Sequence, residues 1–392
     1  MKQLLAYCLS IILCVSFTGC MENYLDLYPE DKITSASFPE NESDIKLLLN
    51  GVYAQLREKE VYNQGLFGFG ITDGATPNAF NWGTDEVFNK LGAGRLSSSD
   101  GGVVTYRWKR CYEIISRANY LLACMDLVDL SEEAKAKDSG ETHFLRGLAY
   151  SVLAETYGGV PIILTDISTE EARSLKRASL EETWQQALDD YEVAITNLGV
   201  DAPEPGRATK GAALGMKMRA YLYQGKYKEV LSCVEQIDAL KKYGLFHSYE
   251  GLFDPANENN KEVLFDIQYI EGENSQGSYI DQYCGTGTGS WTRGSRYVPT
   301  DDLVAAYETI DGSPVDPDNP YENRDPRLGF TAVLPGSYFL GYRFPNYLYP
   351  GGAFNHAGNR LKHLSTRKYR IQDESKLPPS GQSYINDIMD DA

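Results

Sequence analysis

Residues 207–237, RATKGAALGMKMRAYLYQGKYKEVLSCVEQI, do most to limit the folds open to this chain. Small side chains at Ala212, Ala213 and Ala220 alternate with large apolar ones, and Gly225 separates this run from a second amphipathic run. Helical periodicity on both sides of a glycine predicts two antiparallel helices that meet at the alanines. Such a tetratricopeptide-type hairpin buries its apolar faces only by stacking on neighbours, so the sequence predicts several units of this kind.

Further helices are indicated by apolar residues at helical spacing, over residues 42–57, 103–128, 131–157, 179–198 and 301–307. Asn41 and Ser131 stand where helix caps are expected. Ser179 is followed three residues later by Glu182, which is the pattern of a capping box. The helix over 131–157 and the helix before it are predicted to form another antiparallel pair.

Two stretches are predicted to be mainly loop. Residues 63–102 are rich in Gly, Asn, Ser and Asp, and the chain beyond residue 243 is dominated by Gly, Tyr, Asn and Pro. Within the second stretch residues 262–269 have a strand-like pattern, and short strands with few helices are expected there. Long ordered loops commonly carry function. The sequence thus predicts a mainly α chain, a tetratricopeptide-like helical-repeat scaffold with a loop-rich second half containing short strands.

The N-terminus has the features of a secreted lipoprotein. Lys2 precedes an apolar run of signal-peptide length, which is too short to span a bilayer, and Gly19 stands directly before Cys20. We expect residues 1–19 to be a lipoprotein signal peptide and Cys20 to carry the lipid after cleavage. An ordinary secretory peptide with an incidental cysteine is the alternative.

Charge and motif content argue against several classes of protein. The net charge of −18 disfavours nucleic acid and anionic lipid surfaces as partners. The seven cysteines include no CxxC pair and the four histidines no i, i+4 pair, so no metal site is expected. Residues 285–290, GTGTGS, lack the ending of a phosphate-binding loop. We therefore predict that the protein is not an enzyme and that it binds no cofactor. Buried free thiols are the expectation for Cys111, Cys124, Cys233 and Cys284.

Several motifs, taken in order, resemble the SusD/RagB family of outer-membrane nutrient-binding lipoproteins. They are NYLDLYP after Gly19–Cys20, LLNGVYAQL (48–56), YEIISRANYLL (112–122), GETHFLRGLAYSVLAETYGGVPII (140–163), GRATKGAALGMKMRAYLYQGKY (206–227), NENNKEVLFDIQY (257–269), and PTDDLVAAYETIDGS with YENRDPRLGFTAVLPG (299–336). The resemblance implies a helical-repeat region over 20–240 and a loop-rich region over 241–392. Independently of the resemblance, we expect Arg324 and Asp325 to form an internal ion pair or hydrogen bonds rather than a catalytic site.

The resemblance further implies a role at the cell surface. Members of the family sit on the outer membrane by their lipid anchor, capture a glycan or another nutrient, and deliver it to a TonB-dependent (SusC-like) transporter without doing chemistry. Family members usually continue past the stretch that resembles residues 383–391 into a final helical pair. The chain is therefore expected to be truncated relative to the family, with apolar helix faces left uncovered.

A sugar presents C–H faces that stack on aromatic rings and hydroxyls that need amide or charged partners. Trp82 and Trp291 lie in loops at roughly the two places where family members recognise ligands, and we predict that they form a stacking platform. Trp108 and Trp184 lie in helical patterns and are expected in the core. The predicted ligand-binding set is Trp82, Asn78, Asn81, Trp291, Arg293 and Tyr283. The alternative is that either loop tryptophan fills a gap beneath its own loop.

Other functions compete with glycan capture. A helical-repeat adaptor for a partner protein would show buried tryptophans and an apolar groove along the repeats. Uptake of a nutrient other than a glycan, such as peptides, would use the same scaffold. A surface hydrolase would need two acids about 5–10 Å apart in a cleft, and no motif predicts them.

Overall fold

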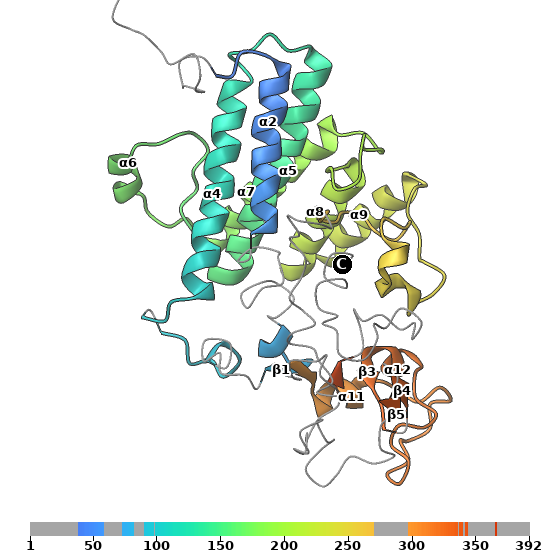
Figure 1. Cartoon of the computed structure of the whole chain (residues 1–392). Helices are drawn as coiled ribbons and strands as arrows, with labels where there is room; N and C mark the ends of the chain where they lie inside the picture. Colours follow the sequence, from blue (N-terminus) through green and yellow to red (C-terminus); the bar gives the residue numbers. More distant parts are fainter. Residues whose placement is uncertain are drawn as a thin grey trace, which may run out of the picture.

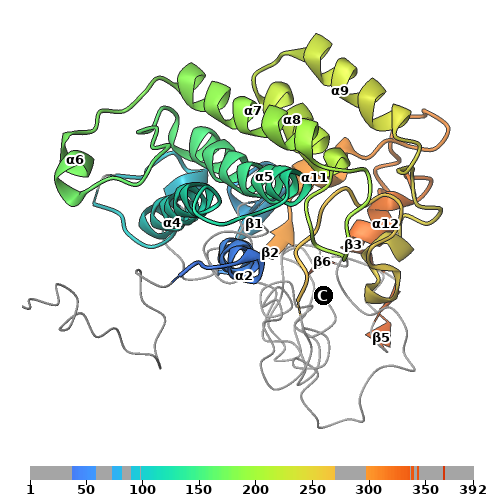
Figure 2. The same ribbon diagram turned by 90° about the horizontal axis from the view of Figure 1, so that it is seen from above.

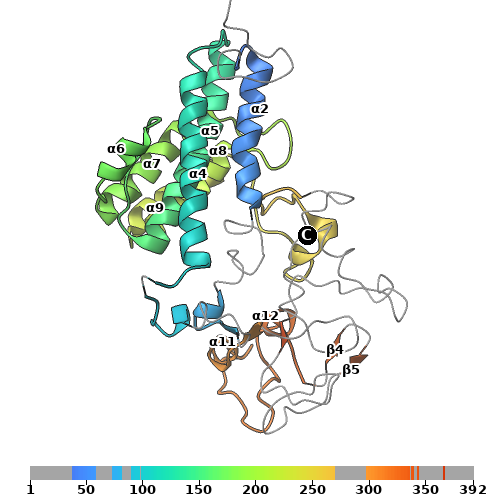
Figure 3. The same cartoon turned by 60° about the vertical axis from the view of Figure 1, so that its left-hand side comes forward.

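The computed structural model describes residues 38–58, 73–81, 90–97, 99–269, 297–335, 337–339, 342–343 and 365–366. The helical repeats and a smaller part with short strands lie at opposite ends of the molecule (Figure 1, Figure 3). The predicted leader and Cys20 fall outside the described residues. Within those residues, no helix combines the length and the apolar character that crossing a bilayer would need.

The helical part follows the predicted pattern. Its elements are α2 (Glu42–Tyr53), the 3-10 turn η1 (Ala54–Arg57), α4 (Val103–Cys124), α5 (Glu132–Tyr157), α6 (Thr169–Ser174), α7 (Leu180–Asn197), α8 (Lys210–Tyr223) and α9 (Tyr227–Ala239). The side chains of Asn41 and Ser131 cap α2 and α5, and Ser179 forms a capping box with Glu182 at α7. These caps satisfy backbone N–H groups that have no partner inside a helix. The short helix α6 was not predicted from the sequence.

The helices stack in series around α5 (Figure 2). Helix α5 packs against α4 on one side and α7 on the other, α7 packs against α8, and α8 against α9, while α2 covers α4 and α5. Most residues in the C-terminal two-thirds of α5 are buried. This arrangement confirms the predicted tetratricopeptide-like stack, including the pair α4–α5 and the pair α8–α9.

Two glycines allow α5 and α7 to approach closely. A Cβ atom on Gly147 would lie 3.0 Å from Asp190 Cβ and 3.1 Å from the Ala187 carbonyl oxygen. A Cβ atom on Gly140, two turns earlier, would lie 3.0 Å from Asn197 Cβ. All three distances are shorter than ordinary van der Waals contacts, so a larger residue at either position would require the neighbouring atoms to shift by a few tenths of an ångström.

A buried polar network fixes how the three central helices are arranged. Arg146 of α5 pairs with Asp190 of α7, with 2.7 Å between Nη2 and Oδ1, and both side chains are buried. Arg146 Nη1 also donates to Asn119 Oδ1 of α4 at 2.8 Å, and Asn119 Nδ2 donates to the Ile163 carbonyl at 3.0 Å. The Arg146 guanidinium therefore joins α5 to α4 and α7, and Asn119 connects this network to the segment that follows α5.

Short strands and small helices make up the smaller part of the molecule, mostly from the second half of the chain. Strand β1 (Ala79–Asn81) pairs with β2 (Tyr297–Pro299), β3 (Ala332–Val333) with β6 (Ser365–Thr366), and β4 (Tyr338–Phe339) with β5 (Tyr342–Arg343), all antiparallel. The described residues of the second half also form helices α11 (Asp301–Ala306) and α12 (Arg327–Thr331) and the 3-10 turns η3 (Gly251–Phe253) and η4 (Pro255–Asn257). Val298, Leu328, Ala332 and Val333 are buried there. The predicted loop-rich region with short strands, and the helix predicted near residue 301, are confirmed.

One strand prediction was wrong. Residues 262–269 form no strand. Their apolar side chains pack on the helical core instead, where the Phe265 ring lies edge-on to Phe144 with 4.9 Å between centroids. The strand-like spacing therefore reflects contact with helices, not with a neighbouring strand.

Arg324 and Asp325 are held internally, by separate partners. Buried Arg324 donates to the carbonyl oxygens of Val304 at 2.6 Å and of Tyr307, at the end of α11. Asp325 pairs with Arg327. The Arg324 cation thus caps the C-terminus of α11, where the helix dipole favours positive charge. Both residues make the structural hydrogen bonds expected of them, and no ion pair with each other.

Two carboxylates are buried on the N-terminal half of α5. Glu141 is 2% exposed and accepts a 2.7 Å hydrogen bond from the Tyr53 hydroxyl. Asp138 is 3% exposed, and its Oδ2 atom has no hydrogen-bond partner. Burial raises the pKa of both carboxyl groups, because removal from water penalises the charged form.

The Arg146–Asp190 pair leads to a stability prediction. Replacing Arg146 with Met leaves a buried carboxylate without its cation, which should cost about 3–5 kcal/mol in the free energy of unfolding. Adding Asp190→Leu to Arg146→Met should recover most of that loss, because no charge then remains buried. Urea denaturation of the single and double variants measures both effects.

A surface pair on the same bundle is the control. Lys46 and Glu42 of α2 are bridged at 2.6 Å with both side chains about half exposed. Lys46→Met should change the free energy of unfolding by less than about 0.5 kcal/mol. An equal loss in Arg146→Met and Lys46→Met would contradict the structural role of the buried pair.

The buried Asp138 carboxyl leads to a second prediction, on pH dependence. Its raised pKa in the folded state means that protonation favours folding. This contribution is fully present below the unfolded pKa and is lost as pH rises through the folded pKa. Asp138→Asn should therefore stabilise the protein by about 1 kcal/mol at pH 7, and this gain should fade as pH falls through the folded pKa and be absent below about pH 4. Denaturation across pH measures it. A gain independent of pH in Asp138→Asn would refute the assignment.

Candidate functional site

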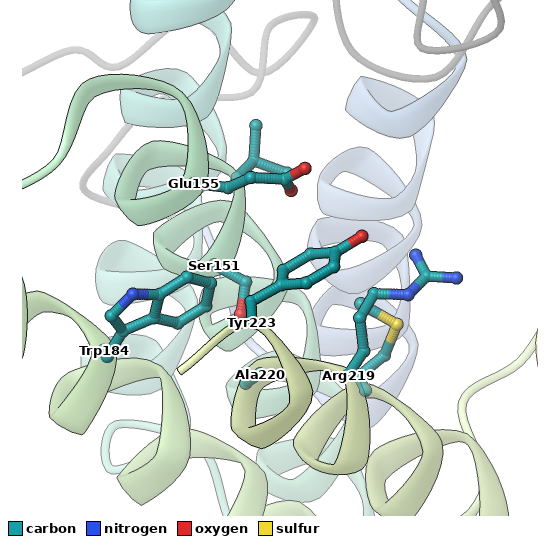
Figure 4. A pocket seen from close by; sticks show the side chains of 8 residues that line it. Ser151, Glu155, Trp184, Arg219, Ala220 and Tyr223 are labelled. Carbon is teal, nitrogen blue, oxygen red and sulfur yellow. The ribbon is translucent and has the colours of Figure 1, made fainter. Parts of the chain in front are cut away.

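A small pocket lies between α5, α7 and α8 (Figure 4). Glu155, Trp184, Arg219 and Tyr223 are among its lining side chains. Its volume is about 10 Å³, which is room for a single water molecule. Trp184 is 6% exposed, which confirms its predicted place in the core. This pocket cannot accept a sugar ring or a peptide side chain.

A wider trough runs along the outer face of α4, with a volume of about 470 Å³. Trp108 and Tyr112 contribute its aromatic side chains. The Trp108 ring, however, already packs against three neighbours, with centroid distances of 5.0 Å to Tyr112 and 5.2 Å to Tyr157, and with the Arg177 guanidinium 5.9 Å away. Trp108 packs against the core as predicted and is poorly placed to stack on a ligand.

The strongest candidate site lies at the β1–β2 ladder. Ala79 pairs with Pro299, Phe80 with Val298, and Asn81 with Tyr297. The ladder joins two segments far apart in the chain, one from each of the two loop regions singled out in the sequence (Figure 1, Figure 2). In the sequence, Trp82 directly follows β1 and Trp291 precedes β2 by a few residues. Both predicted loops therefore connect to the same ladder.

Two of the predicted site residues are described. Asn78 is exposed in the turn before β1, where its N–H donates to Thr76 Oγ1 at 3.1 Å and its carbonyl accepts from the Thr300 N–H at 3.1 Å. Asn81 is the last residue of β1. The structure thus places Asn78 and Asn81 at one ladder. Outside the described residues lie Trp82, Tyr283, Trp291 and Arg293.

Thr300 is a residue of this region that the sequence analysis did not single out. Its Oγ1 accepts from the Leu303 N–H at 3.1 Å, which makes it the N-cap of α11. The same hydroxyl donates to the Pro77 carbonyl oxygen. A threonine directly before a short amphipathic helix is a capping signal, but the bond to Pro77 depends on the tertiary structure.

The described residues show little that could support covalent or metal chemistry. They contain no group of three or more His, Cys, Asp or Glu side chains placed to hold a metal ion. Cys111, Cys124 and Cys233 are buried free thiols, as predicted, and Cys284 lies outside the described residues. Burial raises the pKa of the Cys111 thiol to about 12, so it stays protonated and is a poor nucleophile.

Comparison with known proteins identifies relatives of the chain. It is 26% identical over 321 residues to the SusD-like protein P25 of Formosa agariphila, which covers 76% of this chain and 58% of that protein. It is 23% identical to a SusD-like protein of Bacteroides ovatus, covering 65% of this chain and 48% of the relative. The chain thus spans about half the length of the curated relatives it matches.

Solved structures share the fold. A SusD-like carbohydrate-binding protein from Bacteroides fragilis superposes with a TM-score of 0.73 at 26% identity, covering 88% of this chain and 69% of that one. A laminarin-binding SusD-like protein gives a TM-score of 0.68 at 18% identity, covering 88% and 76%. The helical-repeat architecture described above is therefore that of the SusD-like structures.

Two family models match successive parts of the chain. Residues 23–222 match a SusD-like family described as starch-binding and associating with the outer membrane, and residues 261–385 match the SusD family. The first match alone covers half of the chain, and the second covers most of the loop-rich region that carries β2. By these matches, and by the fold, the chain belongs to the SusD family.

Proposed function

We propose that this chain is a cell-surface lipoprotein that binds a glycan and delivers it to a TonB-dependent outer-membrane transporter, without catalysing a reaction. The observation that supports the proposal is the β1–β2 ladder, because it pairs Ala79–Asn81 and Tyr297–Pro299, the strands next to which the two predicted recognition loops stand in the sequence. Related structures support the choice of ligand. One is named as a laminarin-binding protein, and another was solved with a xylogluco-oligosaccharide.

The chemistry of glycan binding matches the residues that lead into and out of the ladder. We propose that Trp82 and Trp291 stack on sugar rings, with Tyr283 beside them. The amides of Asn78 and Asn81 and the guanidinium of Arg293 would hydrogen-bond to sugar hydroxyls, since amides offer both donors and acceptors. A few polar groups beside an aromatic surface are the usual composition of a small-molecule site.

The proposed location follows from the N-terminal residues. Acyl chains on Cys20 would hold the protein on the outer membrane, because each buried methylene contributes about 0.8 kcal/mol to membrane binding. The net charge of −18 would keep the rest of the protein away from an anionic surface. A lipid tether therefore explains outer-membrane association better than electrostatic adsorption does.

A helical-repeat adaptor is the second candidate, and one observation favours it. Helix α9 exposes Tyr227, Leu231 and Val234, which lie along one face, and the first two are 67% and 63% exposed. Apolar faces of this kind are normally covered by a further helix or by a partner protein. The pocket beside Trp184, at about 10 Å³, is too small to hold a side chain of a partner protein.

The glycan site can be tested by truncating its aromatic rings. We expect the double variant Trp82→Ala/Trp291→Ala to lose at least about tenfold in affinity, by analogy with ring stacking on nucleobases, which contributes about 1–3 kcal/mol per ring. Isothermal titration of the full chain with laminarin, xyloglucan oligosaccharides and starch oligosaccharides measures it. Trp184→Phe, a core substitution, should leave affinity unchanged. Unaltered binding in the double variant would remove the platform, and binding of none of the three glycans would favour the adaptor.

The anchor can be tested separately. Cys20→Ser should move the protein from the membrane fraction to the soluble fraction, because the acceptor of the lipid is lost. Mass spectrometry of the parent should find an acylated N-terminus at Cys20. Cys14→Ser, which alters a cysteine inside the apolar leader, should leave both results unchanged. Recovery of the parent uncut and without lipid would disprove the anchor.

A further inference from the structure

The turn before β1 is attached to the rest of the protein from two sides. Locally, Thr76 Oγ1 donates to the Asp73 carbonyl at 2.7 Å and accepts from the Asn78 N–H at 3.1 Å. From the distant segment, the Thr300 N–H donates to the Asn78 carbonyl at 3.1 Å, and the Thr300 hydroxyl donates to the Pro77 carbonyl. The backbone carbonyls of Pro77 and Asn78 therefore both accept a hydrogen bond from Thr300.

Thr300 also belongs to α11. Its Oγ1 accepts from the Leu303 N–H at 3.1 Å and its carbonyl accepts from the Val304 N–H at 3.2 Å. One residue thus starts the helix and holds the turn across a sequence separation of 223 residues. A β-branched side chain has few rotamers, so the capping bond and the bond to Pro77 reinforce one geometry.

The ladder beside this turn needs such support. It consists of three residue pairs, and a two-stranded ladder of that length is marginal by itself in water. Ala79 and Val298 are buried, but Asn78 is exposed, so apolar packing does not hold the turn. The two bonds from Thr300 extend the pairing beyond the last ladder pair, Ala79 with Pro299.

We infer that Thr300 is a positioning residue of the glycan site, holding the turn at Asn78 in the conformation that a glycan meets. The inference rests on the function proposed above. It does not make the N-terminus of α11 a binding site, because the ligand would contact Asn78 and not the helix. A loop ordered before binding loses less conformational freedom when the ligand arrives, and affinity rises accordingly.

Thr300→Val tests this role, because valine keeps the shape of threonine and removes its hydroxyl. Hydrogen exchange of residues 73–81 in the full chain should become about 3- to 10-fold faster. The Kd for whichever of laminarin, xyloglucan oligosaccharide and starch oligosaccharide binds the parent should rise about 3- to 10-fold. Thr300→Ser restores the hydroxyl and should restore both values.

A second threonine cap provides the matched control. Thr209 caps α8 through the Ala212 N–H at 3.1 Å, and its hydroxyl also contacts the Tyr243 hydroxyl at 3.1 Å. Thr209→Val should lower the thermal midpoint as Thr300→Val does, yet leave the exchange of residues 73–81 and the glycan affinity unchanged. An equal effect of the two variants on exchange or affinity would reduce Thr300 to a general stabilising residue and overturn the inference.

The remaining outcomes separate this inference from the proposed function. Unchanged exchange in Thr300→Val overturns the positioning role whether or not a glycan binds. Suppose that Thr300→Val exchanges faster but binds the glycan with unchanged affinity, while Asn78→Ala binds it more weakly. The glycan site then stands, but Thr300 does not contribute to binding, and the inference is overturned. If the parent binds none of the three glycans, the proposed function fails, and the link between Thr300 and a glycan site fails with it. The hydrogen-exchange rate of residues 73–81 in Thr300→Val still decides whether Thr300 holds the turn.

Discussion

The close packing of α5 on α7 is the constraint on which the rest of the structure depends. Gly140 and Gly147 let the two helices approach to a distance at which a Cβ atom would be crowded, and Arg146 then reaches Asp190 within the interface. A buried ion pair contributes little net stability, because desolvation offsets its attraction. Its effect here is geometric: with the Asn119 bond added, one guanidinium fixes the positions of α4, α5 and α7 together.

The β1–β2 ladder links this scaffold to the loop-rich half. The segment that precedes α4 supplies one strand and the segment that precedes α11 supplies the other. Because the first segment runs into α4 of the helical stack and the second into α11, a short ladder joins two parts of the protein that are distant in the chain. A rigid scaffold that presents loops is a common way to build a binding site, since loops vary while the scaffold does not. The SusD-like fold of this chain has that organisation, and the proposed glycan site uses it.

Predictions from sequence succeeded where the physical cause was local. The caps at Asn41, Ser131 and Ser179 were predicted because each side chain bonds to a backbone N–H within three residues. The strand predicted over 262–269 failed because alternating apolar residues do not reveal whether they face a strand or, as Phe265 does, a helix. At the candidate site, the residue types were recognisable, but Thr300 was missed because its partner Pro77 lies 223 residues away.

The amino-acid sequence alone determined the periodic helices, their ends, the small residues at helix contacts and the loop-rich character of the second half. These features depend on neighbours within one or two turns of the chain, so periodicity and capping reveal them. Only the tertiary structure decided that Arg146 meets Asp190 and Asn119, that Ala79–Asn81 pairs with Tyr297–Pro299, and that Thr300 holds Asn78. Each of these contacts joins segments that are distant in the sequence. No local sequence pattern predicts such a contact, because the contact depends on the path of the whole chain between the two segments.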